Sequence, residues 1–244
     1  MPRLTVRLAD LTIGIDCLYE QTEHLLSDYR HSPADADFSV AVTPTDLENE
    51  RQKCLLQYSR EKKPCPNFTP AELESTALYR KIALVLPLYD AFVFHGSAVA
   101  VGNRAFIFTA KSGTGKTTHT NLWLKNIPDS FVVNGDKPIL RLKNGIPTVY
   151  GTPWMGKENL GQNLSVPLNA ICVLSRGEIN TIEKTTFSAE MMTLIGQTYR
   201  PPQPDRLVAT LKTLEKIGNQ VSLYRLSCNM ENEAAWVSYR GMVL

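Results

Sequence analysis

One stretch of the chain, residues 104–118, constrains the fold more than any other. It reads Arg-Ala-Phe-Ile-Phe-Thr-Ala-Lys-Ser-Gly-Thr-Gly-Lys-Thr-Thr, and a segment of helical composition follows it as far as Pro128. An apolar strand, a glycine-bearing loop and a helix in this order are the context that a phosphate-binding loop requires. The stretch therefore predicts an α/β protein with an anion site where the helix begins.

The residues of this loop suit phosphate chemistry. Gly113 and Gly115 let backbone N–H groups turn toward phosphate oxygens, and the first turn of the helix adds unpaired donors. Lys116 is expected to reach the β- and γ-phosphates, and the Thr117 hydroxyl is expected to bind Mg²⁺. The predicted nucleotide-binding residues are consecutive in the chain: Lys111, Ser112, Gly113, Thr114, Gly115, Lys116, Thr117 and Thr118.

The loop departs from the pattern G-x-x-x-x-G-K-[ST] at its first position, which is Ala110. Alanine is the smallest replacement for glycine, so we expect a slightly strained turn. A polar surface loop in front of an ordinary helix would have a similar composition. The strand and the helix on either side favour a bound nucleotide, ATP or another nucleoside tri- or diphosphate, together with Mg²⁺.

A hairpin is expected to bring a histidine to this loop. Residues 92–101 have the pattern of a strand, and Gly102-Asn103 between two apolar runs indicates a two-residue turn. In that register His95 faces Ala110, at the mouth of the loop. A one-residue slip would turn the side chain to the other face, and His95 would then be a core histidine.

A carboxylate follows the next predicted strand, residues 131–136, which ends in Asn-Gly-Asp. Asp136 would hold Mg²⁺, directly or through water, or activate an attacking hydroxyl. Because Asn-Gly-Asp is also turn chemistry, a simple turn aspartate is the alternative.

A second hairpin, 139–143 and 146–150 around Asn144-Gly145, is expected to carry residues 151–157 back beside Asp136. That segment, Gly-Thr-Pro-Trp-Met-Gly-Lys, would bind a second substrate or a nucleotide base. Its candidate substrate residues are Trp154 and Lys157, with Lys137 next to the carboxylate. A surface loop with Trp154 tucked into the core is the other interpretation.

The remaining sequence predicts two parts. Residues 1–65 are interpreted as a small α+β elaboration in which Thr45 and Glu48 form a capping box, and residues 66–244 as the loop-bearing core. Thr69, Pro70 and Glu72 predict the start of another helix. The later segments alternate between strand and helix patterns, so the expected fold is a mixed α/β, hairpin-rich sheet.

Composition excludes several classes of protein. The net charge of +2 gives no reason to expect nucleic acid or an acidic membrane as a partner. No apolar stretch approaches the length of a membrane-spanning helix, and residues 1–8 lack the apolar core of a signal peptide. Five scattered cysteines without a C-x-x-C pair suggest free thiols. These features predict a cytoplasmic protein.

Three spaced motifs carry a family resemblance: Phe94-His-Gly-Ser-Ala98, Ser112-Gly-Thr-Gly-Lys-Thr-Thr118 and an apolar strand ending at Asp136. Together they resemble the phosphoenolpyruvate carboxykinase / HPr kinase-phosphorylase superfamily, and small bacterial members that carry Gly-Thr-Pro-Trp-x-Gly-Lys. The resemblance implies a carboxykinase-like P-loop core. It also implies that Lys116 contacts phosphates, that Thr117 and Asp136 bind the metal, and that His95 lies near the metal or the transferred phosphate.

Two departures from the family narrow the expected function. The family's Asp-Asp pair is Gly135-Asp136 here, and the arginine signature of HPr kinases is replaced by the segment 151–157. Carboxykinases are much longer and have a phosphoenolpyruvate-binding arginine that is not evident here, so a small carboxykinase is the least favoured function. The leading hypothesis is an HPr-serine-kinase-like phosphotransferase with His95, Lys116 and Asp136 as catalytic residues. Its acceptor is a hydroxyl on a small molecule or a carrier protein.

The alternative function is a regulatory or accessory nucleotide-binding module without phosphoryl transfer, and Gly135 is the residue that favours it. The resemblance leaves both a monomer and a homo-oligomer open.

Overall fold

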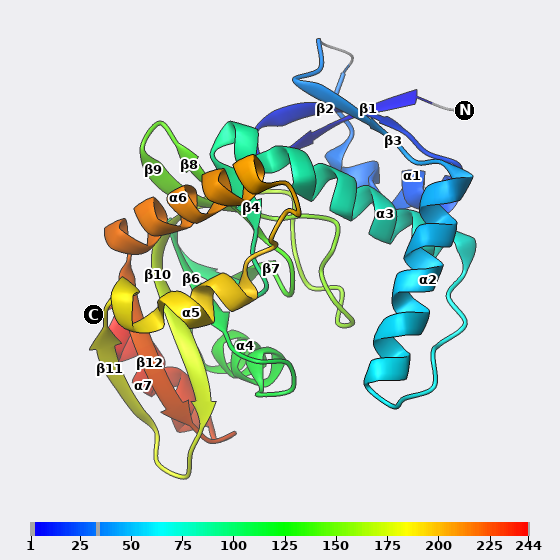
Figure 1. Cartoon of the computed structure of the whole chain (residues 1–244). Coiled ribbons are helices and arrows are strands. Elements are labelled where there is room, and N and C mark those ends of the chain that lie inside the picture. The colour runs from blue at the N-terminus through cyan, green and yellow to red at the C-terminus, as the bar shows by residue number, and fades with distance from the viewer. Residues whose placement is uncertain (1–2, 33–34, 244) are drawn as a thin grey trace. The chain divides into compact units, whose positions relative to one another are not determined.

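The computed structural model describes residues 3–32 and 35–243, which divide between Leu84 and Val85 into two compact units (Figure 1). The expected boundary at residue 65 falls inside the first unit, because the helix that begins at Pro70 groups with the N-terminal strands. The first two residues of the stretch 1–8 lie outside the described residues. Within the described residues, every helix is too short or too polar to cross a membrane.

The first unit combines a small sheet with helices. Its strands follow the order β1-β2-β3, with β1 and β2 antiparallel and β2 and β3 parallel. The elements are β1 (Arg3–Leu8), β2 (Leu11–Asp16), α1 (Glu20–Leu25), the short 3-10 helix η1 (Ser27–Tyr29), β3 (Phe38–Ala41), α2 (Pro44–Arg60) and α3 (Pro70–Val85).

Two capping boxes begin the long helices of this unit. The box of α2 is formed by Thr43 and Asp46, so the predicted pair Thr45 and Glu48 was wrong by two residues. Pro44 explains the shift. Proline has no N–H and suits the first position of a helix, so α2 begins at Pro44 and Thr43 becomes its N-cap. The predicted start of α3 is confirmed, since the Thr69 N–H and hydroxyl donate to the Glu72 carboxylate at 2.7 and 2.9 Å.

The second unit contains a larger mixed sheet. Its strands are β4 (Ala91–Val93), β5 (Ser97–Val101), β6 (Arg104–Thr109), β7 (Ser130–Asn134), β8 (Ile139–Lys143), β9 (Ile146–Tyr150), β10 (Ser165–Arg176), β11 (Thr181–Thr185) and β12 (Ser222–Cys228). Its helices are the short 3-10 helix η2 (Leu86–Tyr89), α4 (Lys116–Asn126), α5 (Phe187–Gln197), α6 (Pro204–Gln220) and α7 (Asn232–Val243). The expectation of a mixed α/β fold is confirmed.

The strand directions decide where a site can form. The central order is β12-β10-β6-β5-β7, in which β10 is parallel to both β6 and β12 while β5 is antiparallel to both β6 and β7. Strands β6, β7, β10 and β12 therefore all run in the same direction. Their carboxyl ends meet at one edge of the sheet, which is where ligands bind in open α/β sheets.

The predicted strand 92–101 is two strands. Strand β4 pairs with β8, whereas β5 pairs with β6 and β7, and the chain changes partners at residues 94–96. The backbone N–H of His95 donates to the carbonyl of Gln197 at 2.7 Å in this break. A continuous strand was wrong because the two halves belong to different parts of the sheet.

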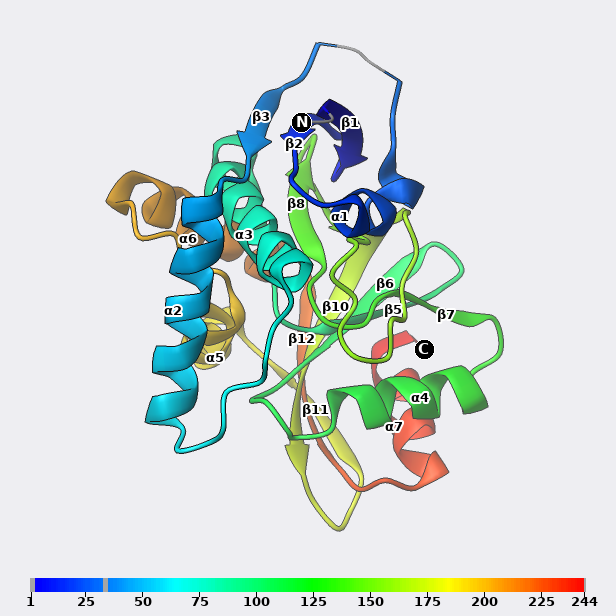
Figure 2. The same ribbon diagram turned by 90° about the vertical axis from the view of Figure 1, so that its right-hand side faces the viewer.

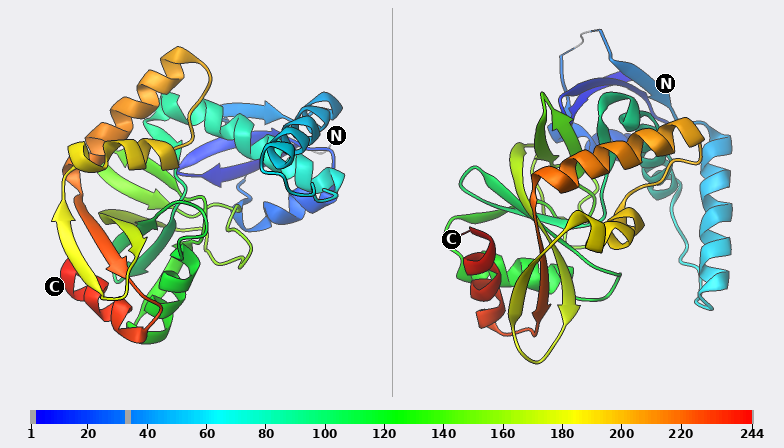
Figure 3. Two further views of the ribbon diagram at one scale, coloured as in Figure 1. Left: turned by 60° about the horizontal axis from the view of Figure 1, so that its bottom comes forward. Right: turned by 60° about the vertical axis from the view of Figure 1, so that its left-hand side comes forward.

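Helices cover both faces of the larger sheet (Figure 3). On one face α5 and α6 pack on an apolar cluster that includes Ile107, Leu194 and Ile217. On the other face α4 and α7 lie side by side (Figure 2) over a cluster that includes Phe106 and Trp123. The burial of these faces fixes β6 and α4, the two elements on either side of the glycine loop.

Candidate functional site

The glycine loop connects the end of β6 to the start of α4. Gly113 and Gly115 have φ values of 79° and 123°, a region that favours glycine. Gly115 is also the N-cap of α4 and supplies no capping side chain, so the first N–H groups of the helix are left for a ligand. The order of strand, loop and helix is the predicted one.

Ala110 fits the loop without backbone strain. Its φ lies outside the left-handed region, and its side chain is buried in the apolar cluster under α4. The expected strain at this position was therefore wrong. The carbonyl of Ala110 accepts a hydrogen bond from Lys116 Nζ at 3.1 Å, which holds the lysine over the loop.

Arg176, at the end of β10, was missed by the sequence analysis. Its guanidinium donates to the carbonyls of Gly113 and Thr114, the latter at 3.3 Å. These bonds attach the glycine loop to a neighbouring parallel strand. The signal was a basic residue close after the predicted strand 167–174, but the pairing of that strand with β6 could not be inferred.

The first hairpin has the predicted register. Val101 pairs with Arg104 and Ser97 with Phe108, as predicted. The pairing ends at Ser97, so the predicted pair of His95 with Ala110 is not formed, because the His95 N–H donates to the Gln197 carbonyl instead. The Thr109 hydroxyl donates to the His95 carbonyl at 2.9 Å. Because the turn chemistry set this register, the histidine reaches the edge of the sheet beside the loop.

His95 lies between two oxygen atoms. Its Nε2 is 3.4 Å from Asp136 Oδ1, and its Nδ1 is 2.7 Å from Gln197 Oε1. The side chains of His95 and Asp136 are 38% and 21% exposed. Gln197 was also missed, because it comes from the end of α5, about a hundred residues further along the chain.

Asp136 is held in an Asn-Gly-Asp turn after β7. Asn134 Oδ1 accepts hydrogen bonds from the N–H groups of Asp136 and Lys137, at 2.9 and 2.7 Å. Burial raises the pKa of the Asp136 carboxyl, but hydrogen bonds from His95 and Lys137 outweigh it and hold that pKa well below its usual range. Asp136 is thus a turn residue and also an ionised group beside His95.

The second hairpin also has the predicted register, with Lys143 opposite Ile146 and Ile139 opposite Tyr150. It brings Thr152 to Lys137, where the Thr152 hydroxyl donates to the lysine carbonyl at 2.8 Å. The chain after this hairpin then runs back along β7.

Gly135 is required by this returning segment. Its N–H donates to the Leu160 carbonyl at 2.8 Å, and an added Cβ would lie 2.9 Å from the carbonyl oxygen of Met155. An aspartate at position 135 would therefore clash with the backbone of residues 155–160.

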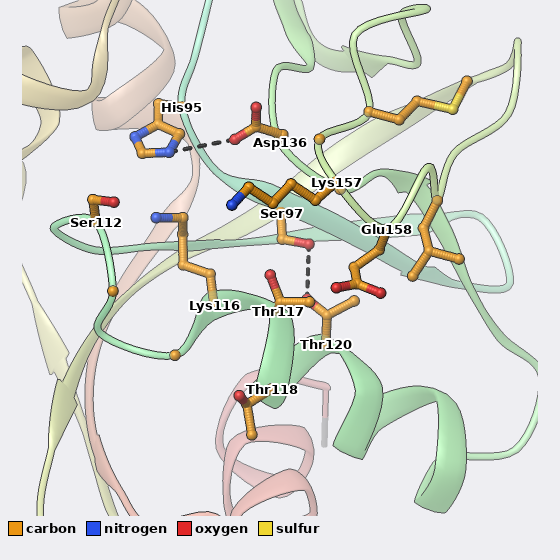
Figure 4. A pocket seen from close by; sticks show the side chains of 16 residues that line it. His95, Ser97, Ser112, Lys116, Thr117, Thr118, Thr120, Asp136, Lys157 and Glu158 are labelled. Atoms are coloured by element: carbon orange, nitrogen blue, oxygen red, sulfur yellow. Dashed lines mark hydrogen bonds and ion pairs between the residues drawn. The ribbon is translucent and has the colours of Figure 1, made fainter. Parts of the chain in front are cut away.

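These elements line one cavity of about 480 Å³ (Figure 4). Lys116 and Lys157 extend into it together with His95 and Asp136 (Figure 4). Burial lowers the pKa of Lys116, and the charge of Asp136 opposes that shift. The lining residues are His95, Ser97, Ser112, Gly113, Gly115, Lys116, Thr117, Thr118, Thr120, Gly135, Asp136, Met155, Gly156, Lys157, Glu158 and Leu160.

Four residues named from the sequence do not line this cavity. Lys111 precedes it in the loop, and Thr114 lines a neighbouring cavity. Lys137 approaches it through its ion pair with Asp136, and the half-buried Trp154 lies outside it. Glu158, which the sequence analysis missed, adds a carboxylate to the lining.

Comparisons with known proteins do not establish a function for this chain. No protein-family model matches the chain, and no curated protein matches it. Among solved structures, the Hpr(Ser) kinase/phosphatase from Coxiella burnetii aligns with a TM-score of 0.34 and 7% sequence identity. The alignment covers 61% of this chain and 95% of that chain. A likeness this low indicates a distant fold relationship at most.

Proposed function

We propose that this chain is a Mg²⁺- and nucleotide-dependent phosphotransferase that moves a terminal phosphoryl group to a hydroxyl acceptor on a small molecule or a carrier protein. The observation that carries the proposal is the position of His95 and Asp136. They line the same cavity as the glycine loop and Lys116. A hydroxyl bound beside the pair would face the end of a phosphate chain held by the loop.

The loop and Lys116 would bind the phosphates. The N–H groups at the start of α4 and the positive end of its dipole favour an anion, and Lys116 Nζ would exchange the Ala110 carbonyl for phosphate oxygens. Fixed donors aimed at the charge of a transferring phosphoryl group are the main source of catalysis in reactions of this class.

The residues present fit a magnesium ion. The Thr117 hydroxyl and the Asp136 carboxylate line one cavity and are the hard oxygen ligands that Mg²⁺ prefers. The described residues contain no cluster of three or more His, Cys, Asp or Glu side chains, which suits an ion that takes most of its ligands from phosphates and water. Bound there, Mg²⁺ would supply positive charge to the phosphate oxygens.

His95 and Asp136 would have different roles toward the acceptor. A carboxylate with a lowered pKa is a weak base, so Asp136 suits the orientation of His95 and the binding of a cation. His95 would contact the acceptor hydroxyl and orient or deprotonate it. Lys157 would bind the charge of an anionic acceptor, and Lys137 would hold Asp136 in place.

Phosphorus NMR across a panel of hydroxyl acceptors tests this proposal. Wild type should transfer phosphate from ATP, and Asp136→Asn should lower kcat about 100-fold or more. ATP affinity, measured in parallel, separates lost chemistry from lost binding. Full activity in Asp136→Asn would remove the catalytic role of this residue.

A nucleotide-binding module without transfer is the second candidate, and the packing at Gly135 favours it. Residues 155–160 occupy the space that a second carboxylate would need. Such a module would retain bound ATP unchanged over many hours, whereas a phosphotransferase supplied with its acceptor would convert it to ADP.

A further inference from the structure

A second cavity borders the glycine loop. It encloses about 420 Å³ and shares Gly113, Gly115 and Thr118 with the first cavity. Most of its other walls come from the ends of β10 and β12, through Leu174, Arg176, Gly177, Cys228, Asn229 and Met230.

The strand order places the two cavities on opposite flanks of β6. His95 lies two residues before β5 and Asp136 two residues after β7, so the first cavity lies on the β5–β7 flank. Arg176 ends β10 and pairs with Cys228 at the end of β12, so the second cavity lies on the β10–β12 flank. The glycine loop follows β6 between them.

This arrangement gives a bound phosphate chain a direction. If the terminal phosphate faces His95 and Asp136, the other end of the chain leaves the loop on the β10–β12 flank. We propose that the second cavity binds the nucleoside, with the purine base against Leu174, Arg176 and Met230. This inference rests on the proposed function, because it assumes that the loop holds a nucleoside triphosphate.

The chemistry of the walls suits a flat, apolar ring. Leu174 and Met230 offer apolar contacts, and burying a purine face against them is favourable. The N–H groups of Arg176 donate to two carbonyls of the glycine loop. The flat face of its guanidinium therefore remains available to stack on the base.

The side chain of Asn229, a polar residue that lines this cavity, already makes two hydrogen bonds. Asn229 Nδ2 donates to the Glu178 carbonyl at 3.0 Å, and its Oδ1 accepts from the Glu231 N–H at 3.0 Å. We therefore expect stacking and apolar contact, rather than hydrogen bonds from Asn229, to hold the base.

The test compares ATP with inorganic tripolyphosphate, which has the phosphate chain but no nucleoside. Calorimetry would be run on wild type, on Met230→Ala and on Met192→Ala. Met192 is a matched control because it is 75% exposed, against 77% for Met230, and lines neither cavity. A truncation at such exposed positions leaves the core intact.

We expect Met230→Ala to weaken ATP binding about fivefold to tenfold and to leave tripolyphosphate binding unchanged. Met192→Ala should change neither. Photolabelling with 8-azido-ATP, followed by peptide mapping, should mark residues 228–230 or 174–177.

Four results would overturn the inference, and they can be told apart. Label confined to other segments, or unchanged ATP affinity in Met230→Ala, would remove the nucleoside from this cavity while the proposed function stands. Equal wild-type affinity for ATP and tripolyphosphate would show that no nucleoside pocket contributes. Wild type that binds neither compound would overturn the proposed function as well.

Discussion

Two carboxylates, one from each unit, have very different surroundings. Glu74, in the first unit, is fully buried, and its oxygens accept hydrogen bonds from the N–H groups of Leu18 and Tyr19 and from the Thr22 hydroxyl. Asp136, in the second unit, is partly exposed to a cavity and is contacted by the ammonium group of Lys137 and by Nε2 of His95.

The difference separates a structural charge from a candidate reactive one. Glu74 accepts hydrogen bonds at the start of α1 and holds it to α3 through neutral donors, of which the Thr22 hydroxyl is buried. Asp136 keeps an open side and has a lowered pKa, the combination that is common at functional sites. Burial of a carboxylate alone would not distinguish the two.

The largest stability effect is expected at Glu74. Glu74→Ala leaves three donors without their acceptor and should lower the free energy of unfolding by about 4 kcal/mol, measured by urea denaturation. Glu74→Gln, which keeps one acceptor oxygen, should lose about half as much. Asp136→Asn should stay within about 1 kcal/mol of wild type, because its open side remains hydrated. Similar losses for Glu74→Ala and Asp136→Asn would break the comparison.

The pH dependence of stability tests the effect of burial at another residue, the buried His119. Burial lowers the pKa of His119 to about 4, and the neutral ring is 3.0 Å from the Ser238 hydroxyl. Between about pH 6.5 and 4 the unfolded chain binds a proton at this position that the folded protein does not. Stability should therefore fall as pH is lowered through this window, by up to about 3 kcal/mol.

Urea unfolding at several pH values, on wild type and His119→Gln, measures this contribution. The variant should lose less stability between pH 6.5 and 4 than wild type does. Identical pH dependence in the two proteins would mean that His119 is protonated as readily in the folded state as in the unfolded chain.

The smallest effect is expected at Lys157, on the KM of the acceptor. It is exposed and lines the cavity with Asp136, so Lys157→Ala should raise the KM of an anionic acceptor about fivefold and leave that of a neutral acceptor unchanged. Lys212→Ala, an exposed lysine on α6, serves as the control. An equal rise in KM for both acceptor types would argue against a charge clamp at Lys157.

Local sequence signals predicted much of the fold and the site. Gly102-Asn103 and Asn144-Gly145 set the registers of two hairpins, and those registers brought His95 and Lys157 to the edge that carries Asp136. The chemistry of two-residue turns is local, so it can be inferred from short stretches.

What could not be predicted depends on contacts between distant segments. Arg176 and Gln197 reach the site only because β10 pairs with β6 and because α5 ends at the break between β4 and β5. Helix α1 was missed because its start is capped by Glu74, more than fifty residues away, and not by a neighbouring side chain. Trp154 illustrates the reverse case, a prominent residue that lies outside the cavity.

Calorimetric titration of Mg²⁺-ATP tests the central claim most directly, on wild type, Lys116→Ala and the exposed control Lys125→Ala on the same helix. Wild type and the control should bind ATP alike, and Lys116→Ala should bind it about 30-fold to 100-fold more weakly, because a charge-assisted contact to phosphate is lost. Equal affinity in all three proteins, or no binding by wild type, would contradict a phosphate-binding loop at residues 110–118.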